Sequence, residues 1–269
     1  MKNFLSYFLF LSLMSCSGNI FQDATSNSGE DDYILQARQY LNEQKYDESL
    51  QIIQTKLSQT AQDSTAVREI VASNYGGKCG LNFVQFTLNL SSQTTGSAFY
   101  RLMTPFVQVV VDPSHCKTSL STMEMIGTTS QRTTNQNAFV AVMGMVLMGT
   151  AMRGYADINP ALGNGIADVN ICSGLTDSQV DDIIIGFGYM SKNLSAVGSS
   201  LIGPSSLGSM DQLITTCTTI AGSNCEVTDP AAISPTVRST VRDLLNTQEY
   251  GIGSFSTGGN DLLIPGACP

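Results

Sequence analysis

The sequence predicts an all-α protein. Apolar residues recur at helical spacing along much of the chain, and helix-start signals precede two of these stretches. Residues 106–111 are the best strand candidate, because most of them are valine, but they fit a buried turn of helix equally well. An even set of cysteines also indicates disulfides. We therefore expect eight to ten helices in an irregular bundle held together by disulfides.

The composition excludes several classes of function. The chain has 269 residues, of which 13% are charged, and its net charge is −9. Such an acidic chain has no electrostatic footprint for nucleic acid. It also lacks the basic patch that attracts proteins to anionic lipid. Its length is enough for one large or two small domains with a hydrophobic core.

The first sixteen residues have the order of a secretory signal peptide. Lys2 supplies the positive start, residues 4–14 are apolar, and the small residue Ser15 precedes the expected cleavage site. Residues 1–15 are therefore the predicted signal peptide. Their removal leaves 269 − 15 = 254 residues, beginning with Cys16.

The tetrapeptide Leu13-Met14-Ser15-Cys16 resembles the lipobox of bacterial lipoprotein precursors. This resemblance implies cleavage before Cys16, a diacylglycerol on its thiol and an acyl chain on its new amine. In such lipoproteins a residue other than aspartate after the cysteine favours the outer membrane, and here Ser17 follows. An ordinary cleaved signal that leaves a free cysteine is the alternative. Residues 16–30 are predicted to be the lipidated flexible tether that links the membrane to a helical domain, residues 31–269.

Six cysteines follow the lipobox, and an even number in an exported chain predicts up to three disulfides in an oxidising compartment. Spacing alone does not choose among the pairings. Cys217 and Cys225 are the nearest neighbours and flank the turn-forming residues 222–224, which favours a local bridge. Cys268 is expected to hold the Gly-rich C-terminal tail in place. The disulfide candidates are Cys79, Cys116, Cys172, Cys217, Cys225 and Cys268.

Residues 31–60 are predicted to form a hairpin of two helices joined near Gln44 and Lys45. Each half carries apolar residues at helical spacing, which gives each helix one apolar face. The faces comprise Tyr33, Ala37, Tyr40 and Leu41 in the first helix and Leu50, Ile53 and Leu57 in the second.

This hairpin resembles one tetratricopeptide (TPR) unit, whose helices pack through large, small and aromatic residues at fixed offsets. Tyr33 and Ile53 stand at the large positions, and Ala37 and Ser49 at the small ones. The resemblance implies that the helices cross at the small pair, because helices approach closely only where side chains are short. The proline that normally follows the second TPR helix is missing. The match covers about 30 residues, so it implies a helical hairpin.

The next segment, residues 65–90, fits the first helix of a degenerate second unit. The Gly76–Gly77 pair either permits tight helix packing or breaks the helix. Residues 72–83 (ASNYGGKCGLNF) also resemble bacterial lipoproteins of unassigned function that carry TPR-like helices. No second full repeat follows, so the rest of the chain must supply the core by other means.

Residues 138–152 are the most apolar internal segment, with Thr150 as the only polar member. At about 1.5 Å per residue the segment spans roughly 22 Å, short of the ~30 Å core of a bilayer. A buried central helix is therefore favoured over a membrane-inserted one.

Further helices are expected toward the C-terminus. Thr176 and Gln179 have the form of a capping box and predict a helix that continues to about Val197. A Gly/Ser/Pro stretch separates it from a helix near residues 210–220. Ser234 before Pro235 predicts the start of a last helix.

Few residues suggest chemistry. His115 precedes Cys116, and this pair needs a free thiolate to act as base and nucleophile. Adjacent residues rarely point toward each other, and we expect Cys116 to be oxidised. The sequence has no G-x-S-x-G elbow, P-loop or dinucleotide fingerprint, and no Cys/His spacing typical of zinc. We therefore expect no enzyme activity, no catalytic residue, no metal and no cofactor.

An oxygen-rich loop follows the apolar helix. It is a candidate calcium site, but it does not fit an EF-hand, whose sixth position is glycine and is Leu162 here. We favour a structural role, because Asp and Asn usually turn and cap the backbone. Asp177, Asp181 and Asp182 near a helix start are likewise explained by the helix dipole. The loop residues are Asp157, Asn159, Asn164, Asp168 and Asn170.

The leading functional hypothesis is a non-enzymatic helical lipoprotein on the periplasmic side of the outer membrane. It would act by protein–protein interaction or as a scaffold, because TPR-like hairpins build grooves that hold peptides or partner helices. The alternative is a carrier or transport accessory that binds a small apolar ligand in its helical core. The periplasmic TPR lipoproteins that accompany TRAP transporters are a family of that kind. A hydrolase of unrecognised type ranks last.

Overall fold

Twelve α-helices and three short 3-10 helices make up most of the chain that the computed structural model describes. It describes residues 29–92, 96–196, 204–222, 224–247, 249–252 and 268. These residues contain no strand, which confirms the all-α class. The expected eight to ten helices were too few, because two helices are single turns of four residues that carry little periodicity. The predicted signal peptide and most of the tether lie outside the described residues.

The chain divides into two compact units, one extending to Val67 and the other beginning at Arg68. The first unit holds α2 (Glu30–Asn42), α3 (Tyr46–Lys56) and α4 (Gln59–Gln62). Helix α5 (Thr65–Lys78) begins in the first unit and continues into the second. The remaining helices, all in the second unit, are α6 (Phe83–Ser92), α7 (Ala98–Met103), η2 (Thr104–Phe106), α8 (Pro113–Glu124), α9 (Thr134–Ala156), α10 (Ile171–Gly174), α11 (Asp177–Asn193), η3 (Leu194–Ala196), α13 (Pro204–Ala221), η4 (Pro230–Ala232) and α14 (Pro235–Leu245).

The first unit contains the predicted helical hairpin. Helices α2 and α3 pack against each other, and the turn between them passes through Gln44, whose φ is 60°. Ala37 and Ser49 are both fully buried, and the Ser49 hydroxyl donates a 2.8 Å hydrogen bond to the carbonyl oxygen of Ala37. The small pair therefore lies where the two helices meet, as predicted. A second bond closes the open end of the hairpin, since the Ser58 amide donates to the Glu30 carboxylate at 2.6 Å.

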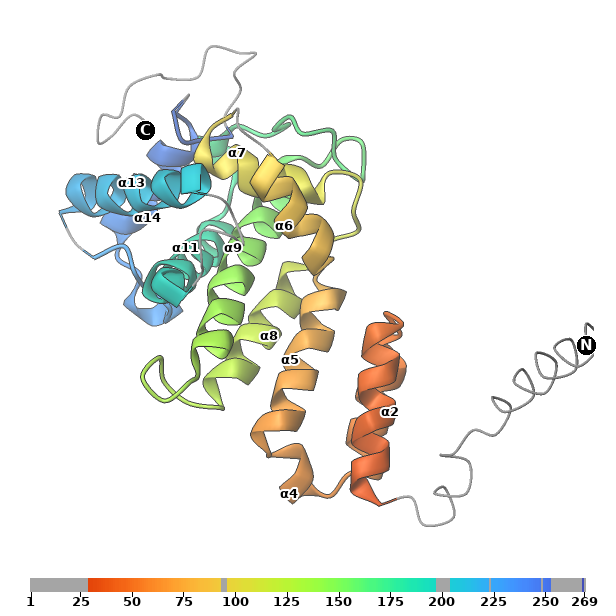
Figure 1. Ribbon diagram of the computed structural model, residues 1–269. Coiled ribbons are helices and arrows are strands. Elements are labelled where there is room, and N and C mark those ends of the chain that lie inside the picture. Colours follow the sequence, from red (N-terminus) through yellow and green to blue (C-terminus); the bar gives the residue numbers. More distant parts are fainter. Residues whose placement is uncertain are drawn as a thin grey trace, which may run out of the picture. The chain divides into compact units, whose positions relative to one another are not determined.

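The second unit is built around α9, against which α7, α8 and α11 pack (Figure 1). This helix has 23 residues, more than the predicted segment 138–152, because a capping box formed by Thr133 and Gln136 starts it earlier. At about 1.5 Å per residue it is long enough to cross a bilayer. It is the one helix of that length and apolarity among the described residues, and 78% of its most apolar window is buried inside the protein. The prediction of a buried central helix is therefore confirmed.

Glycines allow the central helices to approach closely. A Cβ added to Gly144 of α9 would lie 2.6 Å from the carbonyl oxygen of Gly186 in α11, and one added to Gly186 would lie 2.7 Å from the carbonyl oxygen of Gly144. The two backbones are thus in direct contact at this crossing. Gly76 of α5 makes a similar but looser approach, because its Cβ would meet the Met143 sulfur at 3.2 Å. The Gly76–Gly77 pair therefore permits packing and does not break α5.

The strand candidate, residues 106–111, is wrong. Phe106 closes the 3-10 helix η2, and the Val107 and Val109 amides bond to carbonyl oxygens three residues earlier. Pro105 and these local turns leave no extended row of amides to pair with another strand. Gln108 has a φ of 66°, a left-handed conformation that bends the backbone away from the extended path of a strand.

Local capping signals determined the later helices. The capping box of Thr176 and Gln179 is formed as predicted and starts α11. The Ser234 hydroxyl accepts from the Val237 amide and starts α14. Helix α13 begins at Pro204, several residues before the predicted start near 210. Proline favours the first turn of a helix, which explains the earlier start.

The Gly144–Gly186 crossing can be tested against a glycine of the same helix. We expect Gly144→Ala to lower the free energy of unfolding by roughly 1–3 kcal/mol, because the methyl group must push two backbones apart. Gly154→Ala is the control, since its Cβ would meet its nearest neighbour, a Val111 methyl, at an ordinary 3.4 Å. That change should be neutral or stabilising by up to about 1 kcal/mol. Denaturant unfolding measures both, and equal effects would contradict the close crossing.

The hairpin crossing can be tested in the same way. Ala37→Leu should cost roughly 1–3 kcal/mol, because no space remains between α2 and α3 at this fully buried position. Gln39 lies on the exposed side of the same helix, so Gln39→Leu should change stability by no more than about 0.5 kcal/mol. Thermal melts would compare the two variants. An Ala37→Leu variant that melts no lower than Gln39→Leu would rule out the crossing.

Candidate functional site

The six cysteines downstream of Cys16 form three disulfides. The pairs are Cys79–Cys116, Cys172–Cys268 and Cys217–Cys225. The predicted local bridge between Cys217 and Cys225 is confirmed. Cys268 pairs with Cys172, and most of the Gly-rich tail that it was expected to hold lies outside the described residues. The other predicted site residue, Cys16, lies outside the described residues.

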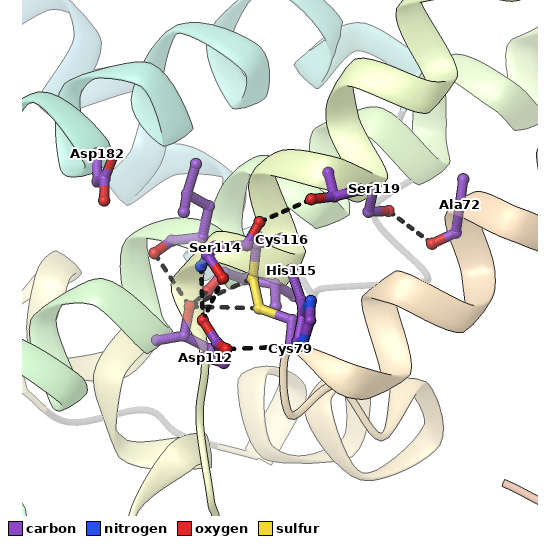
Figure 2. Close-up of a disulfide and its surroundings, with 12 residues drawn as sticks. Ala72, Cys79, Asp112, Ser114, His115, Cys116, Ser119 and Asp182 are labelled. Atoms are coloured by element: carbon purple, nitrogen blue, oxygen red, sulfur yellow. Dashed lines mark hydrogen bonds and ion pairs between the residues drawn. A yellow bond between two sulfur atoms is a disulfide. The ribbon is translucent and has the colours of Figure 1, made fainter. Parts of the chain in front are cut away.

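The disulfide between Cys79 and Cys116 joins the end of α5 to the first turn of α8, as Figure 2 shows. Both cysteines are fully buried, and the Thr150 hydroxyl oxygen of α9 lies 3.6 Å from the Cys79 sulfur and 3.4 Å from the Cys116 sulfur. A further bond runs beside it, from the Ser119 hydroxyl to the Ala72 carbonyl oxygen at 2.7 Å. This cluster ties α5, α8 and the central helix together.

The pairing of Cys116 excludes it as the nucleophile of a His115–Cys116 pair. Its sulfur is bonded to Cys79, and His115 instead faces Asp112, with 3.6 Å between Nε2 and Oδ2 (Figure 2). Asp112 is the N-cap of α8, where its carboxylate accepts from the Ser114 amide at 2.9 Å and from the Ser114 hydroxyl at 2.6 Å. The hydroxyl bond is the main reason that the pKa of Asp112 is lowered. The serine hydroxyl donates to the aspartate and not to the histidine, so no hydrolase triad is formed here.

The acidic residues of α11 do more than favour its N-terminus electrostatically. Asp181 makes a bidentate ion pair with Arg238 of α14, at 2.6 and 2.9 Å. Asp182 is buried, and its carboxylate accepts from the Lys117 ammonium and the Tyr155 hydroxyl, each at 2.8 Å. Asp177 also pairs with an arginine of α14. The helix dipole was therefore an incomplete explanation, because these carboxylates join α11 to α8, α9 and α14.

The oxygen-rich loop after α9 is held by its own polar groups. The carboxylate of Asp157, fully buried, accepts from the Asn164 amide at 2.9 Å and from the Gly165 amide at 2.8 Å. Arg153 binds two carbonyl oxygens of the loop, at 3.1 and 2.6 Å. Asp168 accepts from the Asn159 amide. The described residues contain no group of three acidic, cysteine or histidine side chains placed to hold a metal. The backbone-capping role that we favoured thus accounts for these oxygens.

The same loop displays apolar residues, and they belong to a larger surface. Of the nine large apolar residues that are exposed in the described chain, seven lie on α6, on the segment after η2, or on the loop after α9. Val110 is 77% exposed and Val84 is 66% exposed. We call this surface the uncharged face, because residues 82–92, 104–111 and 158–167 contain no charged side chain. Its seven residues are Phe83, Val84, Leu88, Val110, Ile158, Leu162 and Ile166.

Three contacts bring the segments of the uncharged face together. Helix α6 packs against η2, with the rings of Phe86 and Phe106 5.6 Å apart. The segment after η2 then meets the loop, since the Gln108 amide donates to the Leu162 carbonyl oxygen at 2.7 Å. The Gln108 side chain donates to the Gly163 carbonyl oxygen at 2.6 Å. In Figure 1 the three segments lie at the same end of the second unit.

This face was not predicted, although the sequence carries a signal for it. Residues 65–90 were interpreted as the first helix of a degenerate second unit, whereas the structure divides them between α5 and α6. Burial separates Phe86 and Leu90, which are covered, from Val84 and Leu88, which are exposed. The signal is the long absence of charge in an acidic chain, which becomes meaningful only once the segments are neighbours.

One open hollow of the second unit, of about 410 Å³, is bordered by Glu124, Arg132, Tyr189 and Lys192. Arg132 is buried there and donates to Asn137, to the Gly127 carbonyl oxygen and to Asn193. Its guanidinium is therefore occupied by the protein. Burial, followed by a hydrogen bond to Glu124, raises the pKa of Tyr189.

The fold and these surfaces define a disulfide-bonded all-α protein with exposed apolar residues on three uncharged segments that contact one another. Comparison of the chain with protein-family models, with curated proteins and with solved structures gives no match.

The buried phenols predict a loss of stability in alkali. Burial is the largest cause that raises the pKa of Tyr155 and of Tyr189 in the folded protein. A phenol whose pKa is higher folded than unfolded contributes stability that is complete below about pH 10 and is lost as the pH rises toward the folded-state pKa. We expect the free energy of unfolding to fall above about pH 10, and Tyr189→Phe to fall less steeply. Denaturant unfolding from about pH 8 to about pH 11 measures this, and parallel curves would contradict it.

Proposed function

We propose that the mature protein is a lipoprotein anchored through Cys16 to the periplasmic side of the outer membrane. It acts without catalysis, by binding another protein or as a scaffold. The observation that carries the proposal is the cysteine pairing, because the three disulfides use every cysteine except Cys16. Disulfides persist in oxidising compartments, which supports export. The one remaining cysteine is the one that the lipobox resemblance assigns to acylation.

The positions of the reactive side chains support a non-catalytic role. Cys116 is oxidised, Asp112 caps a helix, and Asp157 holds a loop. Each of these groups is engaged by the protein itself, so none is positioned to activate a substrate.

The hairpin of α2 and α3 is the proposed binding site for a partner protein. Its outer surface carries Leu35, which is 66% exposed, among charged side chains such as Asp31 and Arg38. A single apolar anchor with a charged surround is typical of protein interfaces, in which the rim is polar. The hairpin resembles a TPR unit, and repeats of that kind present helix surfaces to peptides.

The carrier alternative has less support. The methionines of α9 that suited an apolar ligand are buried against neighbouring helices, with Met143, Met148 and Met152 fully covered. At the Gly144 crossing the backbones themselves are in contact. An apolar ligand would have to displace this packing.

Acylation of Cys16 is tested by detergent partitioning. The native chain should enter the detergent phase, because two or more acyl chains give stable membrane anchoring. Cys16→Ala should not mature into a lipoprotein, and Ser15 and Ser17 around it remain as they are. Mass spectrometry of the mature N-terminus would identify the acyl groups. Equal release of both forms into the aqueous phase would refute the lipid anchor.

The same detergent extract tests the partner. After cross-linking in native membranes, pull-down of the chain should recover a defined protein. Leu35→Asp should reduce that recovery, because it places a charge at the centre of the proposed contact. Met125→Asp is the matched control, since Met125 is 62% exposed but lies outside the hairpin. Equal recovery with both variants would show that the hairpin is not the binding site.

A further inference from the structure

We propose that the uncharged face of the second unit rests on the lipid surface of the membrane to which the chain is anchored. This inference rests on the proposed function in one respect, that Cys16 holds the protein at a bilayer. It adds a second contact, which fixes the orientation of the second unit. The partner is the interfacial region of a phospholipid bilayer. Exposed, uncharged aliphatic side chains would insert into it.

The face is displayed by features that cost the protein stability. Gln108 adopts a left-handed backbone conformation, which non-glycine residues rarely take, and Val110 follows two residues later at 77% exposure. The two charged groups at the end of α9 are turned inward, with Asp157 fully buried and Arg153 bound to loop carbonyl oxygens, whereas Asp168 is exposed and accepts from the Asn159 amide. Ile158, Leu162 and Ile166 remain outside. This arrangement covers the charges of Arg153 and Asp157 and leaves the three aliphatic residues in contact with the surroundings.

Charge decides which part of the protein can meet lipid. The chain has a net charge of −9 and therefore avoids anionic lipid over most of its surface. Residues 82–92, 104–111 and 158–167 carry no charge, so they enter a bilayer interface without desolvating an ion. The hairpin differs from the uncharged face, since residues 30–57 include charged side chains on both helices. The hairpin is therefore better matched to a protein partner, and the uncharged face to lipid.

The anchor keeps lipid within reach. Thirteen residue steps separate Cys16 from Gly29, the first described residue, so the chain between them spans at most about 47 Å in any conformation. The first unit follows the tether and is joined to the second through α5, so a contact between the second unit and the bilayer is intramolecular and its effective concentration is raised.

Site-specific fluorescence on the full acylated chain tests the proposal. Because the disulfides and the acylated Cys16 use all seven cysteines, a single new cysteine is the only thiol available for a fluorophore. Leu88→Cys, Val110→Cys and Ile166→Cys place a label in each segment of the face. Met125→Cys is the control, exposed to 62% in the same unit but outside the face. Each variant is reconstituted in phosphatidylcholine vesicles, and unchanged circular dichroism confirms that it is folded.

A quencher attached to the lipid should dim the three face labels several-fold more than the Met125 label. This difference should persist at high salt, because no ion pair contributes. Face labels that an aqueous quencher reaches as readily as the Met125 label would overturn the proposal. Labels that are shielded from both quenchers, in a chain that cross-links to a second copy, would also overturn it, because protein then covers the face.

Failure of the anchor is a separate result. A chain without acyl groups in native cells would refute the proposed lipoprotein. A Cys16→Ser chain, in which the introduced cysteine is again the only free thiol, is then labelled and mixed with the same vesicles, and quenching by the lipid-attached quencher tests the inference independently of the anchor. Quenching confined to the face labels would support it. Absence of such quenching would overturn it.

Discussion

Direct contact between the backbones of α9 and α11 at Gly144 and Gly186 is the constraint on which the second unit depends. Each glycine lies where a methyl group would overlap the carbonyl oxygen of the other helix. This close approach buries α9 along most of its length, and α7 and α8 then pack on its remaining sides. A helix long and apolar enough to cross a membrane becomes the core of the unit because its neighbours can approach it so closely.

Covalent and ionic cross-links surround this core. The Cys79–Cys116 disulfide lies against Thr150 of α9 and joins the ends of α5 and α8. The buried carboxylate of Asp182 in α11 accepts hydrogen bonds from a lysine of α8 and a tyrosine of α9. A buried carboxylate is costly unless its oxygens are bonded, and here both are. These polar residues of the second unit therefore serve to position helices.

The end of α9 connects the core to the surface. Arg153 and Asp157 are buried at its last turn and bind the backbone of the loop that follows. Their charges are satisfied inside, so the outer side of the loop is free to carry isoleucine and leucine. Gln108 then links this loop to the segment beside α6. Surface and core are thus parts of one hydrogen-bonded arrangement, and the exposed aliphatic residues are held in place by it.

The sequence by itself determined what depends on near neighbours. Helical periodicity predicted the hairpin, and its small residues Ala37 and Ser49 lie at the crossing. The capping box at Thr176 and the cap at Ser234 formed as predicted, because a cap bonds amides only three residues away. The short spacing of Cys217 and Cys225 likewise indicated a bridge. The contacts behind these features join residues at most 12 positions apart in the chain.

The tertiary structure decided what depends on distant segments. Spacing did not show that Cys79 pairs with Cys116, or Cys172 with Cys268, because both pairings depend on how helices far apart in sequence meet. The valine-rich residues 106–111 had strand composition but no second strand to pair with, so local turns took their amides. The uncharged face is assembled from three separate segments, none of them conspicuous alone. Burial and contact between remote parts of the chain are properties of the packed fold, and single-residue patterns carry little information about them.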